Sequence, residues 1–275
     1  MLALLNKWMQ ILKKFTNPWF TSENVMSLSA PLIGMCVVFS CLALLGYLCG
    51  IELLYRPLGY DEATHPLTAI SIFLIALAMW FGRKSPTSFS PYIMALVAAL
   101  IVGFRLIDFY FSLTLSEIFT PFKAQVAADI QSGKSNAMGV NTAVMLFIMA
   151  AAVVFKQANK LVVSQLLAFI SLAIPVTSLT GYAYNISAFY GQMSEPTSIF
   201  GCALGISILA ATANAGGLKA ILSTHSGGTI ARVQALACYL IPLLLGFLVI
   251  KSFNTTAQQA YLVFMWWQFV GLLSS

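Results

Sequence analysis

The sequence has 275 residues, of which 60% are hydrophobic and only 8% are charged, and its mean hydropathy is +0.89. Soluble domains carry about 25% charged residues, so this composition excludes an ordinary water-soluble protein. The formal net charge of +6 does not indicate nucleic-acid binding. The basic residues stand singly or in pairs at the ends of apolar runs, where membrane topology accounts for them.

The first segment of the chain predicts an amphipathic helix over residues 2–16, with lysines on one face and Trp and Leu on the other. A helix of this kind lies in the membrane interface. It does not fit a secretory signal, because the lysines come too late and no cleavage site precedes Pro18. We therefore expect a cytoplasmic interfacial helix and linker over residues 1–28, followed by a single transmembrane bundle over residues 29–275.

The rest of the chain consists of apolar runs separated by short connectors, and runs of roughly 18 or more apolar residues are typical of transmembrane helices. The fold class is therefore all-α and polytopic, with about eight transmembrane helices. The predicted spans are 29–49, 66–82, 91–112, 140–156, 162–183, 197–214, 231–250 and 257–273. They pair into four tandem helical hairpins over about 29–82, 91–156, 162–214 and 231–273. No connector is long enough to form a separate catalytic domain, so no enzyme is expected.

An internal repeat supports the hairpins. The pattern Gly-Tyr-x-x-x-Ile-x-x-x-Tyr begins at Gly46 and again at Gly181, and each copy is followed by a connector and a proline that opens the next apolar run. Similarity of this kind indicates tandem structural units. Looser Thr-Ala openings at Thr142 and Thr256 suggest two further units. Proline at these starts suits the first turn of a helix.

The basic residues also predict the orientation. With eight spans, nine of the fourteen Lys and Arg residues fall on the side of the N-terminus, four fall on the opposite side, and Arg105 falls inside a span. Cytoplasmic loops carry the excess of Lys and Arg. We therefore expect a multi-pass membrane protein with both termini in the cytoplasm.

Candidate binding residues gather near the predicted outer face. Arg105 and Asp108 share one face of the third span, and charges at membrane depth are functional candidates by default. The alternative is a self-neutralising pair that fixes packing. Outer tyrosines line a ligand pocket or form an interfacial aromatic belt. The candidate ligand-binding residues are Arg105, Asp108, Tyr47, Tyr55, His65, Tyr182, Tyr190 and Glu195.

Other chemistry finds little support in the residue pattern. The five cysteines lie mostly inside apolar runs and show no metal-ligand spacing, so we expect no metal, no cofactor and no catalytic residue. A haem held by two histidines is disfavoured, because His65 and His225 fall on opposite membrane faces. The Gly-rich inner loop lacks the phosphate-binding pattern and is read either as a turn with a helix cap or as a loop that couples to a partner. Its candidate residues are Ser226, Gly227, Gly228 and Arg232.

Several short motifs carry a family resemblance. They are Met138-Gly139-Val140-Asn141-Thr142-Ala143-Val144, Leu179-Thr180-Gly181-Tyr182-Ala183-Tyr184, Thr197-Ser198-Ile199, Leu222 to Arg232, and Ile241-Pro242-Leu243-Leu244-Leu245-Gly246-Phe247. In order, they resemble the N-terminal membrane sensory region of bacterial multidomain histidine kinases and diguanylate cyclases. The chain departs from that pattern at His225, where an acid is usual, and at Glu195, where His is common. Those proteins continue into cytoplasmic output domains, whereas this sequence stops at Ser275.

The resemblance implies a signal-sensing or partner-binding module of the bacterial inner (cytoplasmic) membrane, without enzymatic output. We expect a sensory or accessory subunit that acts through other membrane subunits and contacts membrane lipids. A lipid, a quinone or another apolar ligand would bind near the outer face with Arg105 as its anchor. The alternative is a small-molecule transporter, which needs a polar cavity and broken helices in mid-membrane. A redox subunit, the third class considered, would show visible absorbance.

Overall fold

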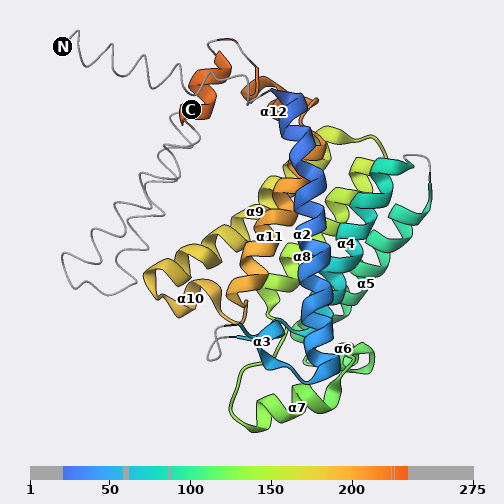
Figure 1. Cartoon of the computed structure of the whole chain (residues 1–275), viewed down its shortest axis with the longest axis vertical. Helices are drawn as coiled ribbons and strands as arrows, with labels where there is room; N and C mark the ends of the chain where they lie inside the picture. Colours follow the sequence, from blue (N-terminus) through green and yellow to red (C-terminus); the bar gives the residue numbers. More distant parts are fainter. Residues whose placement is uncertain (1–20, 58–61, 86–87, 224, 226, 235–275) are drawn as a thin grey trace, which may run out of the picture.

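The computed structural model describes residues 21–57, 62–85, 88–223, 225 and 227–234, which form helices joined by turns and loops, with no strand among them. The long helices lie side by side, and short helices close the two ends of the bundle (Figure 1). The helices are α2 (Ser22–Cys49), α3 (Glu52–Tyr55), α4 (Pro66–Lys84), α5 (Ser90–Phe111), α6 (Leu115–Phe119), α7 (Lys123–Gln131), α8 (Val140–Gln157), α9 (Leu161–Tyr184), α10 (Ser187–Tyr190), α11 (Glu195–Ala211) and α12 (Gly216–Ile221).

Local sequence sets where the long helices begin. The Thr21 hydroxyl accepts the backbone N–H of Asn24 at the start of α2, and the Ser194 hydroxyl does the same for Thr197 in α11. Side-chain acceptors of this kind satisfy N–H groups that have no partner inside the helix. His65 plays this part for α4, whose first residue is a proline. Proline is favoured there because its missing N–H would have no helical partner.

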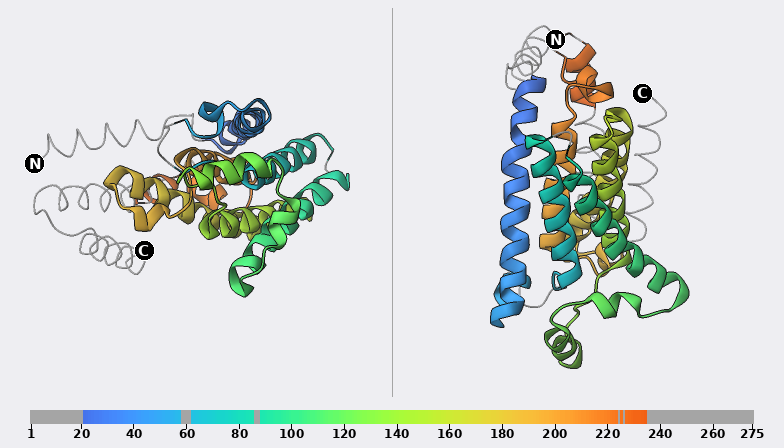
Figure 2. Two further views of the ribbon diagram at one scale, coloured as in Figure 1. Left: turned by 90° about the horizontal axis from the view of Figure 1, so that it is seen from below. Right: turned by 90° about the vertical axis from the view of Figure 1, so that its right-hand side faces the viewer.

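Helices that follow one another in the sequence pack against each other. α2 contacts α4, α5 contacts α8, and α9 contacts α11. α8 joins α5 to α9, and α11 returns to pack against α2, as the views in Figure 2 show. At that last contact the rings of Phe39 and Phe200 stack with centroids 3.9 Å apart. Glycines bring helices close together, since a Cβ at Gly201 would lie 2.7 Å from the sulfur of Met145.

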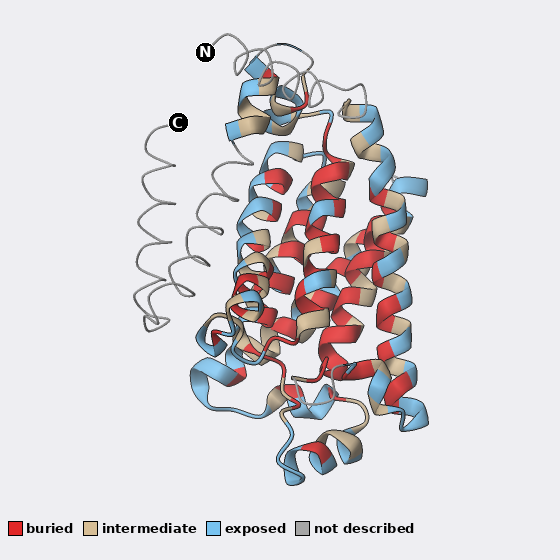
Figure 3. Cartoon of the chain, turned by 60° about the vertical axis from the view of Figure 1, so that its left-hand side comes forward, coloured by how far each residue is buried: buried red, intermediate tan, exposed pale blue. Residues whose placement is uncertain are grey.

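The exposed surface of the bundle is largely apolar. In Figure 3 buried residues follow the inner faces of the helices and exposed residues follow the outer faces. The outer faces carry large apolar side chains such as Leu48, Leu100 and Leu166, which are 67%, 61% and 60% exposed. Five described helices, α2, α4, α5, α8 and α9, are long and apolar enough to cross a membrane, and α11 is a shorter apolar helix. The chain is thus an all-α protein with the character of a multi-pass membrane protein.

The helix ends differ little from the predicted spans. α2 begins at residue 22 rather than 29, and α11 ends at residue 211 rather than 214. α2 starts earlier than predicted because Thr21 caps it there. Its first turn is polar, so the apolar pattern did not include it. The predicted amphipathic helix over residues 2–16 lies outside the described residues. So do the last two predicted spans, apart from residues 231–234, which are helical.

The first Gly-Tyr motif folds into a compact corner at the end of α2. The Gly46 carbonyl accepts the N–H of Ile51 at 2.8 Å, and Gly50 takes a left-handed conformation with φ 70°. The chain then turns into α3, so the rings of Tyr47 and Tyr55 stack with centroids 4.0 Å apart. A Cβ on Gly46 would lie 2.9 Å from the Ile51 carbonyl oxygen, so only glycine permits this turn.

The second motif takes the same geometry at the end of α9. The Gly181 carbonyl accepts the N–H of Ile186 at 2.8 Å, and a left-handed Asn185 leads into α10. The rings of Tyr182 and Tyr190 stack with centroids 4.1 Å apart. A Cβ on Gly181 would lie 3.0 Å from the Ile186 carbonyl oxygen. The two sequence motifs therefore encode the same corner, built from the same hydrogen bond and the same pair of rings.

Candidate functional site

The long connector between α5 and α8 builds most of the candidate site. Its first turn is held by Asp108, whose carboxylate accepts the backbone N–H groups of Leu115 and Ser116 at 2.7 and 2.6 Å. Asp108 thereby fixes the start of α6 against the end of α5. No ion pair joins Asp108 to Arg105 in the described part of the chain, although the two residues share a helix face. The direct contact that a self-neutralising pair of Arg105 and Asp108 would make is therefore not seen among the described residues.

A buried ionic network ties the connector to the first Gly-Tyr corner. The side chain of Arg56 is 1% exposed and forms ion pairs of 3.0 Å with Glu52 and with Asp129 of α7. Lys134 binds Glu52 on the exposed side of the network, at 2.7 Å. Burying a charge is costly unless it is paired and hydrogen-bonded. The Arg56 network therefore fixes the position of α7 beside α3.

Asn136 extends the network toward the aromatic corner. Its amide donates to Asp129 at 2.8 Å, and its oxygen accepts from the hydroxyl of Tyr47 at 3.1 Å. The same hydroxyl also lies 3.1 Å from the carbonyl oxygen of Thr64. Phe122 stacks on Tyr47 with a centroid separation of 5.8 Å. These contacts fix the position of the segment that leads into α8. Residues 136–138 of this segment line a cavity.

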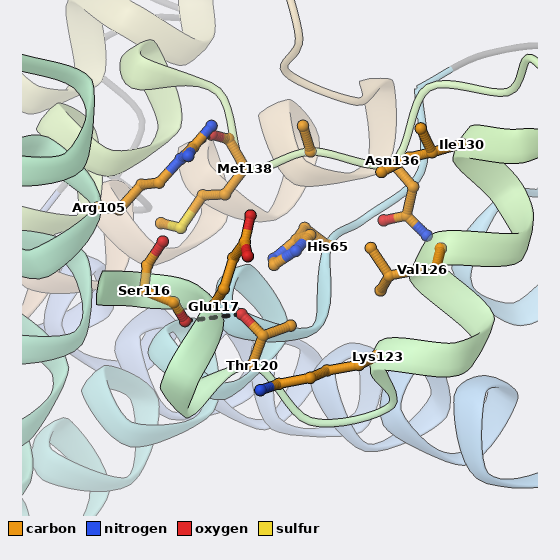
Figure 4. Close-up of a pocket in the computed structure, with 12 residues that line it drawn as sticks. His65, Arg105, Ser116, Glu117, Thr120, Lys123, Val126, Ile130, Asn136 and Met138 are labelled. Carbon is orange, nitrogen blue, oxygen red and sulfur yellow. Dashed lines mark hydrogen bonds between the residues drawn. The ribbon is translucent and has the colours of Figure 1, made fainter. Parts of the chain in front are cut away.

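The cavity has a volume of about 390 Å³ and lies where the start of α4, the end of α5 and the connector meet. Ligand pockets typically have volumes of about 300–1,000 Å³. Figure 4 shows its charged side chains, with the Glu117 carboxylate standing between the Arg105 guanidinium and the Lys123 ammonium. The lining residues are His65, Arg105, Ser116, Glu117, Thr120, Lys123, Val126, Ala127, Ile130, Asn136, Ala137 and Met138.

Arg105 is held in place through one nitrogen. Its Nε donates to the carbonyl oxygen of Met138 at 2.8 Å, and the Met138 side chain lines the cavity beside it. No ion pair engages Arg105, Glu117 or Lys123 among the described residues. The cavity is therefore lined by two cations and one acid that form no direct ion pair with one another.

His65 adds a neutral donor to the wall. The residue is 8% exposed, and its Nδ1 accepts the backbone N–H of Leu67 at 3.2 Å, so the remaining proton sits on Nε2. Burial lowers the pKa of His65, and the positive charge of Arg105 lowers it further, to about 3. At neutral pH the imidazole is uncharged. It presents an N–H group rather than a positive charge to a ligand.

The structure brings together two of the eight candidate ligand residues predicted from the sequence. Arg105 and His65 line the cavity. Asp108 lies nearby but is used as the cap of α6. The four tyrosines form the two stacked pairs, with Tyr47 and Tyr55 only 0% and 6% exposed, and they do not line the cavity. Glu195 lies in the first turn of α11, also away from the cavity lining.

The described residues of the Gly-rich loop pack against the end of α12. Arg232 donates to the carbonyl oxygens of Ile221 and Ser223 at 2.7 and 3.0 Å and to the Thr229 hydroxyl at 3.1 Å. A Cβ on Gly228 would clash with the Ser223 carbonyl oxygen, whereas Gly227 faces open space. Of the candidate coupling residues, Arg232 and Gly228 thus pack against residues 221–223 at the end of α12. Ser226 lies outside the described residues.

Metal ligands do not gather in the part of the chain that the structure describes, which contains no group of three or more His, Cys, Asp or Glu side chains able to hold an ion. His65 begins α4, whereas His225 follows α12 at the opposite end of the bundle (Figure 1). The two histidines are therefore too far apart in the fold to ligate one haem.

Sequence reasoning missed the contribution of the connector between α5 and α8. Ten of the twelve lining residues come from positions 116–138, where the sequence analysis named no candidate binding residue. Two signals pointed to it: its length, and its mixture of Glu, Lys and Asp with apolar side chains. Long ordered connectors in compact domains are often functional.

Comparison with protein-family models, with curated proteins and with solved structures finds no match to this chain. The similarity to sensory regions therefore stays a prediction.

Proposed function

We propose that this chain is a non-enzymatic sensory or accessory subunit of a membrane complex, which binds an amphiphilic ligand such as a lipid or a quinone in the Arg105 cavity. One observation carries the proposal. A cavity with unpaired charges lies at the end of the bundle where long connectors meet, while the middle of the bundle is packed. Signal or assembly information would pass from the ligand, along the helices, to partner proteins.

The packed middle favours this function over a transporter. Ile72, Met79 and Leu146 are fully buried in one continuous apolar core. Buried hydroxyls there mostly bond to the preceding turn of their own helix, as Ser71 does with the Leu67 carbonyl oxygen at 2.7 Å. α2 and α9 continue as helices through Pro31 and Pro175. A transporter would instead need broken helices around a polar site near mid-membrane.

The proposed topology has eight spans in four tandem hairpins, derived from a duplicated unit, with both termini in the cytoplasm of a bacterium. Two features support it. The Gly-Tyr corners at Gly46 and Gly181 share their geometry, and Arg83, Lys84, Lys160 and Lys219 gather at the α12 end of the bundle. An excess of Lys and Arg marks cytoplasmic loops. The cavity end then faces the outer side of the inner membrane.

Purification from native membranes tests the proposal. The tagged chain is isolated in mild detergent, and co-migrating proteins and bound small molecules are identified by mass spectrometry. We expect at least one membrane protein partner, and we expect Arg105→Ala to lose the bound amphiphile. Arg83→Ala removes an exposed arginine at the other end of the bundle and should retain it. The proposal fails if Arg105→Ala keeps the ligand, or if the chain carries neither ligand nor partner.

A further inference from the structure

The charge pattern of the cavity narrows the chemistry of its ligand, an inference that rests on the proposed function. Arg105 and Lys123 stand on either side of Glu117, and no ion pair joins the three groups (Figure 4). A purely anionic ligand would gain from the two cations but would be repelled by the carboxylate. A purely cationic ligand would meet the opposite conflict. A ligand that carries both charges has a favourable partner for Glu117 as well as for Arg105.

We propose that the cavity binds a zwitterionic group in which a phosphate or carboxylate is joined by a short linker to a protonated amine. The oxyanion would bind the terminal nitrogens of Arg105, whose Nε is already fixed by Met138, and the Nε2–H of His65. The amine would donate to Glu117. Hydrogen bonds with an ionised partner on each side are among the stronger ones in proteins.

The surroundings of the cavity favour an amphiphile as the source of this group. A cavity of 390 Å³ accommodates a headgroup but not long acyl chains. Beside it, Ile118 and Phe119 of α6 are 67% and 56% exposed, and Phe111 at the end of α5 is 63% exposed. Such side chains provide an apolar surface for chains that remain in the bilayer. A soluble zwitterion of the same chemistry is the other source, and the experiment separates the two.

The test measures lipid binding to the purified full chain by native mass spectrometry. The probes are phosphatidylethanolamine, which has a phosphate and a primary ammonium, and phosphatidylglycerol, which has the phosphate without the amine. We expect wild-type protein to prefer phosphatidylethanolamine by about tenfold, the ratio expected for one charge-assisted hydrogen bond. Glu117→Gln should abolish the preference, and Arg105→Gln should weaken binding of both lipids. Glu23→Gln, an exposed acid at the other end of the bundle, should change neither.

The arms distinguish failure of this inference from failure of the proposed function. If wild-type protein prefers phosphatidylglycerol, or if Glu117→Gln keeps the preference, the zwitterion is wrong, while a ligand lost with Arg105→Gln still supports the cavity as a binding site. If Arg105→Gln changes the binding of neither lipid, the cavity itself is not the site. Soluble glycerophosphoethanolamine is added as a competitor. Displacement by it at lipid-like concentrations supports a soluble zwitterion, and displacement only at far higher concentrations supports the lipid.

Discussion

Removing Asp129 should be far more damaging than removing the other acid that contacts Arg56. Asp129→Ala deletes the 3.0 Å ion pair with a guanidinium that is 1% exposed and the 2.8 Å hydrogen bond from Asn136. Leaving a buried charge without its partner costs about 3–5 kcal/mol. Because Glu52 remains beside Arg56, we expect the lower part of this range, about 3 kcal/mol. Equilibrium unfolding in mixed detergent micelles, followed by circular dichroism, measures this change.

Glu52→Ala is the matched control. It deletes contacts of 3.0 and 2.7 Å, but the Glu52 side chain is 37% exposed, and exposed ion pairs contribute only about 0–1 kcal/mol. The double replacement Arg56→Met with Asp129→Leu should recover much of the stability lost in Asp129→Ala, because no charge is then buried alone. The reasoning is refuted if Glu52→Ala destabilises the protein as much as Asp129→Ala, or if the apolar pair is no better than Asp129→Ala.

Three further outcomes are expected. Gly181→Ala should cost about 1–3 kcal/mol in the same unfolding assay, because its Cβ would lie 2.5 Å from the Cβ of Phe189. Gly34→Ala is the control: its Cβ would meet open space, so the change should be neutral or slightly stabilising. Equal effects of the two substitutions would contradict the corner geometry. The free energy of unfolding should fall as the pH drops from about 6.5 toward 3. In this range His65 is protonated in the unfolded chain, where its pKa is ordinary, but stays neutral in the folded protein. His65→Asn should flatten this pH dependence and exposed His225→Asn should not; a slope unchanged by His65→Asn would place the titrating group elsewhere. Tyr47→Phe should cost about 1–3 kcal/mol, since it removes the one hydroxyl donor that two buried acceptors share; a neutral result in the unfolding assay would show that water replaces it.

The six predicted spans that fall within the described residues agree closely with the helices there, because they depend on local properties of the chain. An apolar run of membrane length must satisfy its backbone hydrogen bonds internally, so it becomes a helix wherever it occurs. Its ends are set by nearby residues, as Pro66 and Gly50 show at the start of α4 and after α2. The two Gly-Tyr corners were recognisable for the same reason, since each is closed by contacts within about ten residues.

The sequence by itself thus determined the all-α membrane class and most helix boundaries. It also marked Arg105 and His65 as candidate binding residues, because a polar side chain in or beside an apolar run can be recognised without knowing its neighbours in the fold. Only the tertiary structure decided that these two residues share a cavity with Glu117, and that Asp108 caps a helix instead of joining them. It also decided that Arg56 is neutralised by Asp129, 73 residues away in the chain. These contacts between residues far apart in the sequence depend on how distant helices pack. Hydrophobic periodicity does not predict which charged connectors will lie beside each other.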